Sequence, residues 1–387
     1  MDFKDNTEEA AFRTQVKDFI DNEINAEVKD GELAERGMYR GAFERLKGLR
    51  QKLSSRGWIA PAWPKEYGGA GLSVMQQFIM NEEFAENRVP PVGGMGVSMV
   101  GPTLITHGSD DQKKEHLSRI LSGEVQWCQG FSEPGSGSDL ASLQTRAVKD
   151  GDDYVINGQK IWTTGAQFSD MMYMLARTDP DAPKHRGISY FLLDMKAPGV
   201  TVRPLITMAG SATFNEVFFE NVRVPARNRL GEENRGWYIG TTTLDFERSS
   251  IGSSVGIRKM LEGVIKFAQE HPEASPGRTK RDTQLALADR WIEANVAKLM
   301  SYRVISMQNA GLVPNHEASM CKLFGLEAVG RVTDRALLVF GGIGYTRKHP
   351  IERLYRDARL NWLEEGPPTI QYMVAAAALL NGYEWDR

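Results

Sequence analysis

Apolar residues in the first third of the chain recur at the spacing of one helix face. The positions that carry this pattern are Ala11, Val16, Phe19 and Ile20, followed by Phe43, Leu46, Leu49 and Leu53. A connector rich in glycine, proline and aromatic residues, 57–69, separates them from later helical segments. The pattern predicts an all-helical N-terminal domain over residues 1–123.

After residue 123 apolar and polar residues alternate, as they do in half-buried β-strands. The expected strands are 145–148, 154–156, 159–163, 171–176, 188–193, 200–202 and 217–224. The dipeptides Asp150-Gly151 and Asn157-Gly158 are typical of hairpin turns, so each is expected to join two antiparallel strands. We predict an antiparallel, barrel-like β-domain of roughly six to eight strands over residues 124–240.

Helical spacing returns after residue 240. One expected helix presents Ile251, Val255, Met260, Val264 and Phe267 on one face, and the next presents Leu285, Ala288, Ile292, Val296 and Leu299. Two more helices are expected over residues 318–340 and 369–380. This order predicts an α+β fold in which a C-terminal four-helix bundle, residues 241–387, follows the β-domain.

The composition of the chain mainly argues against several classes of protein and of site. The 387 residues are 41% hydrophobic and 25% charged, with a net charge of −3, which argues against a nucleic-acid-binding surface. No uncharged stretch is typical of a membrane span, and the acidic start lacks the apolar core of a secretory signal. The 2 cysteines cannot form a disulfide framework and the 6 histidines are isolated, so we expect a cytoplasmic protein without a metal site.

The run of small residues at 132–139, Ser-Glu-Pro-Gly-Ser-Gly-Ser-Asp, is the first candidate for chemistry. It lacks the third glycine of a dinucleotide-binding fingerprint, and a hairpin pattern follows where that fold has a helix. It also lacks the Lys-Ser/Thr pair of a phosphate-binding loop. Gly252-Ser253-Ser254-Val255-Gly256 matches a serine-hydrolase motif, but it lies within a helical pattern instead of following a strand.

A strand that ends at Phe131-Ser132 leaves backbone N–H groups and a hydroxyl at its terminus. A later strand ends in Trp162-Thr163-Thr164, which adds an aromatic face and further hydroxyls. Together these groups suit a planar, hydrogen-bonding cofactor such as an isoalloxazine. The alternative from the residues alone is that Trp162 belongs to the core and both threonines are ordinary strand residues.

Six segments in the same order along the chain resemble motifs of the acyl-CoA dehydrogenase family. Residues 63–71 resemble its WPxEYGGxG connector, 132–139 its TEPGAGSD signature and 158–164 its GxKxWIT strand. Residues 340–345 are similar to FGGxGY, 355–359 to the RDA segment that follows, and 363–366 to IYEG. Their common order makes the resemblance specific, although any one motif alone would be weak.

The resemblance implies that family's three-domain fold and a non-covalently bound FAD. In it, Phe131 and Ser132 contact the pyrimidine side of the flavin, Trp162 packs on the ring and Thr164 bonds near N5. The cofactor-binding residues that it implies are Phe131, Ser132, Gly137, Ser138, Trp162, Thr163, Thr164, Arg278, Gly342, Pro367 and Thr369. Those implied for the acyl-CoA substrate are Ser138, Leu244, Asp245 and Arg248.

The reaction that the resemblance implies is α,β-dehydrogenation of an acyl-CoA thioester. A carboxylate removes the α-proton while a hydride leaves the β-carbon for flavin N5. Because this proton is weakly acidic in water, the site must stabilise an enolate-like oxygen and exclude water. Glu365 aligns with the base of most of the family, and Glu247 with that of its isovaleryl-type branch. Glu365 is therefore the expected base and Glu247 the alternative, while Glu364 is expected to be a solvated or packing carboxylate.

The resemblance also implies an electron-transfer flavoprotein as electron acceptor, and a homotetramer or homodimer, with a heterotetramer as the alternative. The family's RxxFG segment, which reaches the FAD of a neighbouring subunit, is replaced by 271–279, where Arg278 is the expected substitute. This replacement and the Pro367-Pro368 pair resemble the corresponding segments of a bacterial subgroup that acts on bulky or steroid-type acyl-CoAs. The alternatives are a relative with oxidase or monooxygenase chemistry and a non-catalytic acyl-CoA-binding subunit.

Overall fold

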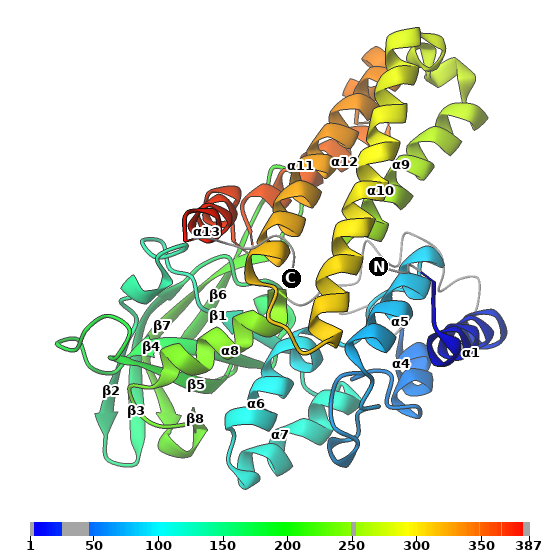
Figure 1. Cartoon of the computed structure of the whole chain (residues 1–387). Helices are drawn as coiled ribbons and strands as arrows, with labels where there is room; N and C mark the ends of the chain where they lie inside the picture. The colour runs from blue at the N-terminus through cyan, green and yellow to red at the C-terminus, as the bar shows by residue number, and fades with distance from the viewer. Residues whose placement is uncertain (1–3, 25–45, 249–252, 348, 365, 382–387) are drawn as a thin grey trace. The chain divides into compact units, whose positions relative to one another are not determined.

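The computed structural model describes residues 4–24, 46–248, 253–347, 349–364 and 366–381 (Figure 1). The chain divides into two compact units. We call Met1–Glu23, Ser73–Val89 and Ser250–Arg387 the helical unit, and Ile24–Leu72 with Pro90–Ser249 the sheet unit. The segment that the sequence predicts as one N-terminal helical domain contributes residues to both units, and the predicted domain boundaries stay predictions.

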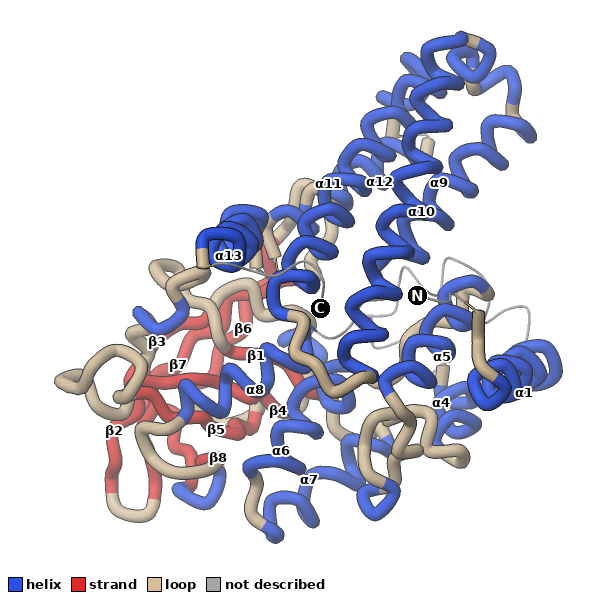
Figure 2. Tube along the Cα trace, in the orientation of Figure 1, coloured by secondary structure: helices blue, strands red, loops and turns tan. Residues whose placement is uncertain are grey.

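The sheet unit contains an eight-stranded sheet, drawn in red in Figure 2. Its strands are β1 (Trp127–Gly130), β2 (Arg146–Asp150), β3 (Asp153–Lys160), β4 (Met171–Arg177), β5 (Ile188–Asp194), β6 (Val200–Leu205), β7 (Phe214–Pro225) and β8 (Arg229–Leu230). They follow the order β6-β7-β3-β2-β4-β5-β8, and β1 pairs with β4. The predicted β-domain is confirmed with one correction, because β1 and β2 both pair with β4 in parallel. The long connection between β1 and β4 permits this parallel pairing, which a tight turn does not.

The hairpin between β2 and β3 turns at Gly151, whose φ of 63° is readily adopted by glycine. The predicted turn at Asn157-Gly158 is wrong, because both residues lie inside β3. There the Asn157 side chain accepts the backbone N–H of Asn221, next to a shift in the register between β3 and β7. Gly158 is required by close packing, since a Cβ on it would lie 2.6 Å from Thr145 Oγ1.

Replacing Gly158 by alanine should lower the free energy of unfolding by about 3 kcal/mol, because the added Cβ meets backbone and side chain at once. Gly151→Ala is the matched control, since its φ is also positive but nothing lies within 4 Å of an added Cβ. The free energy of unfolding of that control should fall by only about 1–2 kcal/mol, which is the strain of the left-handed backbone. Equilibrium urea unfolding at neutral pH measures both, and equal losses would contradict the packing argument.

Helices complete the sheet unit: α4 (Lys47–Ser54), α6 (Gly101–His107), α7 (Asp110–Ser122) and α8 (Gly236–Arg248). The start of α7 is specified locally, because Ser109 and Gln112 form a capping box in which each side chain accepts the other's backbone N–H. α8 packs against β5, as Figure 1 shows. Thr243 anchors α8, with its hydroxyl 2.9 Å from that of Thr103 on α6 and 3.3 Å from that of Tyr190 on β5.

The helical unit contains α1 (Thr7–Glu23), α5 (Val74–Glu86), α9 (Ser253–Glu270), α10 (Arg281–Asn309), α11 (Asn315–Phe340), α12 (Pro350–Ala358) and α13 (Pro368–Leu380). α11 packs against α9, α10, α12 and α13 (Figure 1). The predicted C-terminal helices are confirmed, and α12 is a further helix that the pattern did not indicate. On α1 the exposed Ala11 was wrongly assigned to the apolar face, where Phe12 lies instead.

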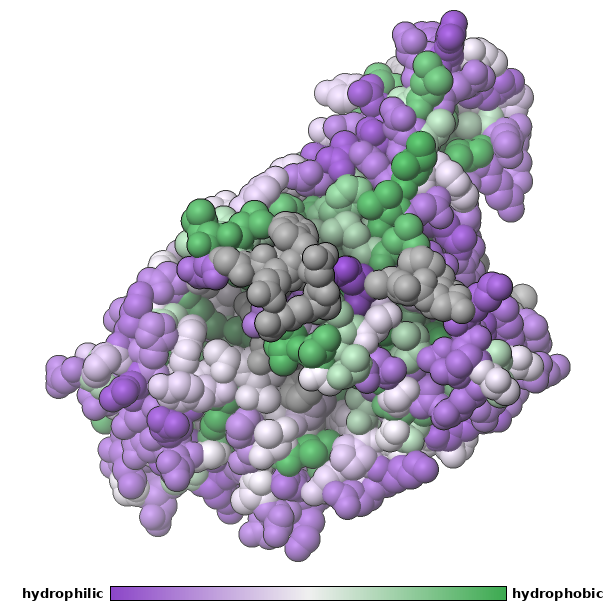
Figure 3. Space-filling model, viewed as in Figure 1, coloured by the Kyte–Doolittle hydropathy of each residue, from purple (hydrophilic) through white to green (hydrophobic). Residues whose placement is uncertain are grey.

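The apolar face predicted for α10 is not its buried face. Leu285, Ile292, Val296 and Leu299 are 57%, 61%, 37% and 47% exposed, and Figure 3 shows apolar side chains along this helix. The buried face uses small residues instead, such as Ala294 and Ala297, which pack in one cluster with residues of α11. Small side chains let two long helices approach closely, and this closeness leaves the larger apolar residues on the outer face.

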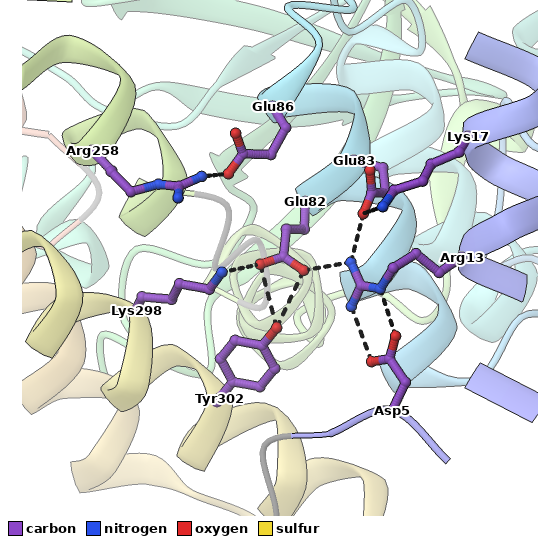
Figure 4. Close-up of a pocket in the computed structure, with 9 residues that line it drawn as sticks. All are labelled: Asp5, Arg13, Lys17, Glu82, Glu83, Glu86, Arg258, Lys298 and Tyr302. Atoms are coloured by element: carbon purple, nitrogen blue, oxygen red, sulfur yellow. Dashed lines mark hydrogen bonds and ion pairs between the residues drawn. The ribbon is translucent and has the colours of Figure 1, made fainter. Parts of the chain in front are cut away.

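Charged side chains form a cluster that joins α1, α5, α9 and α10 within the helical unit (Figure 4). Its members are Asp5, Arg13, Lys17, Glu82, Glu83, Glu86, Arg258, Lys298 and Tyr302. The Glu82 carboxylate lies 2.7 Å from Arg13 Nη1, 2.6 Å from Lys298 Nζ and 3.2 Å from the Tyr302 hydroxyl. Because the cluster contains four carboxylates and four cations, it is suited to holding helices together more than to binding a charged ligand.

Candidate functional site

The ends of two strands lie next to each other in the sheet unit. β1 leads into Phe131 and Ser132, while β3 ends at Lys160. The Ile161 N–H donates to the Ser132 carbonyl at 2.9 Å, and Lys160 Nζ donates to the Phe131 carbonyl at 3.0 Å. The structure therefore brings the Phe131-Ser132 segment against the start of the segment 161–164, as a shared binding site requires.

Trp162 is exposed just after the end of β3, with 58% of its surface accessible. The interpretation of Trp162 as a core residue is therefore wrong. Its φ of 61° lies in the left-handed region, which is uncommon for a non-glycine residue and is enriched at functional sites. The indole contacts the Phe214 ring edge-on, with centroids 6.2 Å apart, so the ring is supported while most of its surface stays accessible.

Thr163 is buried, and its hydroxyl has no hydrogen-bond partner within the described residues. Its backbone is fixed, because its N–H donates to the Asn215 carbonyl at 3.0 Å and Asn215 Nδ2 donates to its carbonyl at 2.9 Å. Because this hydroxyl is enclosed by the protein, it offers no surface to a ligand, and Thr163 serves to fix the backbone between Trp162 and Thr164. The accessible indole of Trp162 near the half-buried Thr164 fits a planar cofactor with a polar edge.

The small-residue loop 132–139 is closed by its own backbone. The Glu133 N–H donates to the Ser136 carbonyl at 2.9 Å, and the Ser136 N–H donates back at 3.0 Å. Gly137 and Ser138 are exposed, and a Cβ added to Gly137 would meet no atom within 4 Å. The chain leaves space around this turn, and the expected contacts of Gly137 with the cofactor and of Ser138 with cofactor and CoA stay predictions.

Among the residues implied for the substrate, Leu244 lies half-buried on α8. The side chains that lie outside the described part of the structure are those of Asp245, Glu247 and Arg248. The anchored Thr243 directly precedes Leu244, so the position of this turn of α8 within the sheet unit is well determined by buried hydrogen bonds.

The other implied cofactor residues belong to the helical unit. Arg278 is half-buried in the turn η7 (Pro276–Thr279), and Gly342 is exposed in the turn η8 (Gly341–Tyr345). A Cβ added to Gly277 would lie 2.2 Å from the Leu338 carbonyl oxygen. This short distance shows that η7 packs closely on the end of α11, directly before η8. Pro367 is the N-cap residue of α13, and Thr369 lies in its first turn.

Glu365 lies outside the described residues, but the residue after it is described. Gly366 has a φ of 87°, and its carbonyl accepts a hydrogen bond from Gln371 Nε2 at 2.8 Å. A Cβ at this position would lie 2.6 Å from Gln371 Nε2. The backbone angle therefore favours glycine directly after the expected base, while the end of the flexible Gln371 side chain would have to move to admit a Cβ.

Sequence reasoning missed Glu133 and Lys160, which form a buried ion pair with a separation of 2.7 Å beside the site. Lys160 lies on the same side of β3 as Tyr154 and Ile156, and all three are buried. The alternating pattern carried this signal, but the predicted turn at 157–158 interrupted it. No comparable signal marks Glu133, because its burial depends on contacts with distant segments.

Some other kinds of site have no candidate in the described part of the chain. No group of His, Cys, Asp and Glu side chains among these residues could hold a metal ion. None of the described helices has both the length and the apolar character that crossing a membrane requires. Cys128 and Cys321 are free, buried thiols.

Models of all three acyl-CoA dehydrogenase domains match this chain. The N-terminal domain matches residues 6–124, the middle domain residues 128–222 and the C-terminal domain residues 234–380. The chain belongs to the acyl-CoA dehydrogenase family. Members of this family are FAD-dependent flavoproteins, and the exposed Trp162 with the half-buried Thr164 fits the flavin ring of that cofactor.

Several known proteins share most of their length with this chain. Acyl-CoA dehydrogenase FadE26 of Mycobacterium tuberculosis is 39% identical, over 78% of this chain and 78% of that protein. Caffeyl-CoA reductase-Etf complex subunit CarC of Acetobacterium woodii is 32% identical, over 95% of this chain and 96% of that protein. The solved structure of the Tcur3481-Tcur3483 steroid ACAD is 30% identical with a TM-score of 0.86, over 99% of each chain. The predicted order of a helical, a β-sheet and a second helical domain is confirmed.

Proposed function

We propose that the chain catalyses α,β-dehydrogenation of a saturated acyl-CoA thioester to the trans-2-enoyl-CoA. The observation that carries this proposal is the accessible Trp162 beside the half-buried Thr164, in a chain of the acyl-CoA dehydrogenase family. Both groups follow the residue that is hydrogen-bonded to Ser132, so an aromatic surface and several polar groups converge on one place. A flavin ring needs this combination of a flat contact and donors at its edge.

When bound, FAD supplies the two-electron oxidation by accepting the hydride that leaves the β-carbon. The residues of this chain have other tasks. Trp162 gives the ring a flat contact, Thr164 offers a hydroxyl donor to it, Thr163 fixes the backbone between these two residues, and Phe131 and Ser132 contact the pyrimidine side of the ring. Arg278, Gly342, Pro367 and Thr369 are proposed for the rest of the cofactor.

Glu365 is the proposed base. Its carboxylate takes the α-proton, and the electron pair of that C–H bond becomes the new double bond as the hydride leaves the β-carbon. Exclusion of water by bound substrate raises the pKa of a carboxylate and with it the basicity. Glu247 is the alternative base, and Ser138, Leu244, Asp245 and Arg248 are proposed to contact the acyl-CoA.

The test is anaerobic addition of saturated acyl-CoAs, with straight, branched and steroid-type acyl groups, to the FAD-loaded protein. The steroid-type compounds are included because one structural relative is a steroid ACAD. At least one acyl-CoA should bleach the flavin absorbance, and the corresponding enoyl-CoA should form in equal amount. A purified protein that binds acyl-CoA but holds no FAD would instead be a non-catalytic subunit.

An electron-transfer flavoprotein is the proposed electron acceptor, supported by the relative that is a subunit of an Etf complex. The reduced protein should be reoxidised quickly by an electron-transfer flavoprotein and slowly by oxygen. Rapid oxygen consumption during turnover would indicate oxidase or monooxygenase chemistry instead.

We infer that the exposed apolar face of α10 is covered by another subunit, because four large apolar side chains on one helix are poorly placed in water. A homotetramer or homodimer is proposed, and a heterotetramer is the alternative. Light scattering of the purified chain gives the subunit number, and a chain that stays monomeric would point to a different partner subunit. A cytoplasmic location is also proposed, since a reducing compartment preserves the free thiols of Cys128 and Cys321.

A further inference from the structure

A buried ion pair lies beside the site and has no part in the proposed chemistry. Lys160 is fully buried, Glu133 is 7% exposed, and Lys160 Nζ lies 2.7 Å from Glu133 Oε1. Taking two charges out of water is unfavourable, so a buried pair often stabilises a protein no more than apolar residues of the same volume. The contacts of this pair therefore say more about its role than its burial does.

Both carboxylate oxygens of Glu133 and the Lys160 Nζ atom have hydrogen-bond partners. Glu133 Oε2 accepts the Gln144 N–H at 2.6 Å, and Oε1 also accepts the Thr145 N–H at 2.9 Å. Lys160 Nζ donates a further bond to the Phe131 carbonyl at 3.0 Å. Burial by itself raises the pKa of Glu133, but the charge of Lys160 and these hydrogen bonds hold it below its usual value. Burial lowers the pKa of Lys160 to about 8, although Glu133 opposes that shift.

The pair joins the two segments of the site. Glu133 directly follows Ser132, and Lys160 lies two residues before Trp162. A backbone bond from Ile161 to the Ser132 carbonyl lies between these contacts and reinforces them. Movement of the Lys160 side chain would therefore shift the strand end at 131–132 relative to the indole and the hydroxyl that follow Lys160.

We propose that Glu133 and Lys160 are positioning residues for FAD. Their ion pair sets the separation between the Phe131-Ser132 backbone and the side chains of Trp162 and Thr164, and it thereby controls FAD affinity and the rate of flavin reduction. This inference rests on the proposed function, because it assigns both segments to one flavin site. Neither positioning residue contacts flavin or substrate in this proposal.

The first test compares K160M with K184M. Lys184 forms an ion pair with Asp139 of the same loop at 2.8 Å, but these side chains are 50% and 61% exposed, so this variant is a matched control. K160M should bind FAD about tenfold more weakly and reduce it about 100-fold more slowly at saturating acyl-CoA, with little change in KM. K184M should match the unchanged protein in all three quantities.

The double variant E133Q/K160M separates positioning from stability. It leaves no unpaired buried charge, so its melting temperature should recover relative to K160M. Its FAD affinity and the circular dichroism of its bound flavin should stay altered, because the contact between the two segments is still lost. Recovery of affinity, flavin spectrum and reduction rate together would show that the pair only stabilises the fold, and this result would overturn the proposal. The same double variant provides the test if K160M does not fold.

FAD affinity and the flavin spectrum are measured without acyl-CoA, by fluorescence titration of the apoprotein and by circular dichroism. A loss of affinity in both Lys160 variants with no bleaching of the unchanged protein by any acyl-CoA would support the positioning role and refute the proposed function. Unaltered affinity, spectrum and reduction rate in K160M would refute the positioning role alone. An unchanged protein that binds no FAD would refute both.

Discussion

Replacing Glu365 by glutamine is expected to slow reduction of the bound flavin by a saturated acyl-CoA about 10³-fold, the loss typical of removing a catalytic base. The amide has nearly the same size but is not basic enough to take the α-proton effectively, so the double bond forms only slowly. FAD affinity should stay unchanged, because the base acts on the substrate. The neighbouring Gly366, anchored by Gln371, is untouched by this substitution. Single-turnover mixing without oxygen measures the reduction rate.

Glu247→Gln and Glu364→Gln are the matched controls, since each removes the same charge from a glutamate of the same chain. Both should reduce flavin close to the rate of the unchanged protein. A slow Glu247→Gln together with a fast Glu365→Gln would assign the base to Glu247. If all three variants stay fast, none of these three glutamates is the base.

Replacing Glu82 by glutamine is expected to lower the free energy of unfolding by about 3 kcal/mol, because it leaves the half-buried Arg13 and Lys298 without this buried carboxylate. Glu82 is 5% exposed and binds both Arg13 and Lys298 (Figure 4). The loss should fall at the low end of the range for buried pairs, since Arg13 keeps Asp5 and Glu83 as partners. Urea unfolding at neutral pH measures the difference.

Glu270→Gln is the control for Glu82, because the Lys266–Glu270 pair spans 3.8 Å and its side chains are 73% and 56% exposed. Such an exposed pair should contribute less than about 1 kcal/mol. An equal loss in both variants would mean that burial of the Glu82 cluster adds nothing to stability.

The contribution of Glu82 should also depend on pH with a definite sign. Burial by itself raises its pKa, but hydrogen bonds from Lys298 and Arg13 outweigh burial and hold the pKa below the usual 4.5. A lowered pKa in the folded state contributes stability above pH 4.5 that is lost as the pH falls through the folded value. The difference between the unchanged protein and Glu82→Gln should therefore shrink below that pH in the same unfolding experiment.

Much of the fold follows from short-range patterns that the sequence displays directly. The hairpin at Gly151 was predicted correctly, because a two-residue turn depends on residues next to each other. The same dipeptide signal failed at Asn157-Gly158, where the glycine serves the approach of Thr145 and the asparagine binds Asn221 of β7. Both contacts cross from one strand to another, so no local pattern reports them.

The candidate site also combines features that the sequence predicted with features that depend on contacts between distant segments. Its two segments, 131–132 and 162–164, were found from their residue types and from the family motifs. That Trp162 is exposed and Thr163 is buried became clear only from the packing around them. The Glu133–Lys160 pair was missed because a charged residue in a sequence is far more often solvated than buried.

The sequence by itself determined the kind and order of the secondary structure, the family and the identity of the residues proposed for chemistry, because these depend on spacing along the chain and on local motifs. Only the tertiary structure decided which face of α10 is buried, that β1 and β2 run parallel to β4, and that Lys160 donates a hydrogen bond to the Phe131 carbonyl. The physical reason is that burial and ion pairing depend on neighbours brought together by folding, and residues far apart in the sequence supply those neighbours.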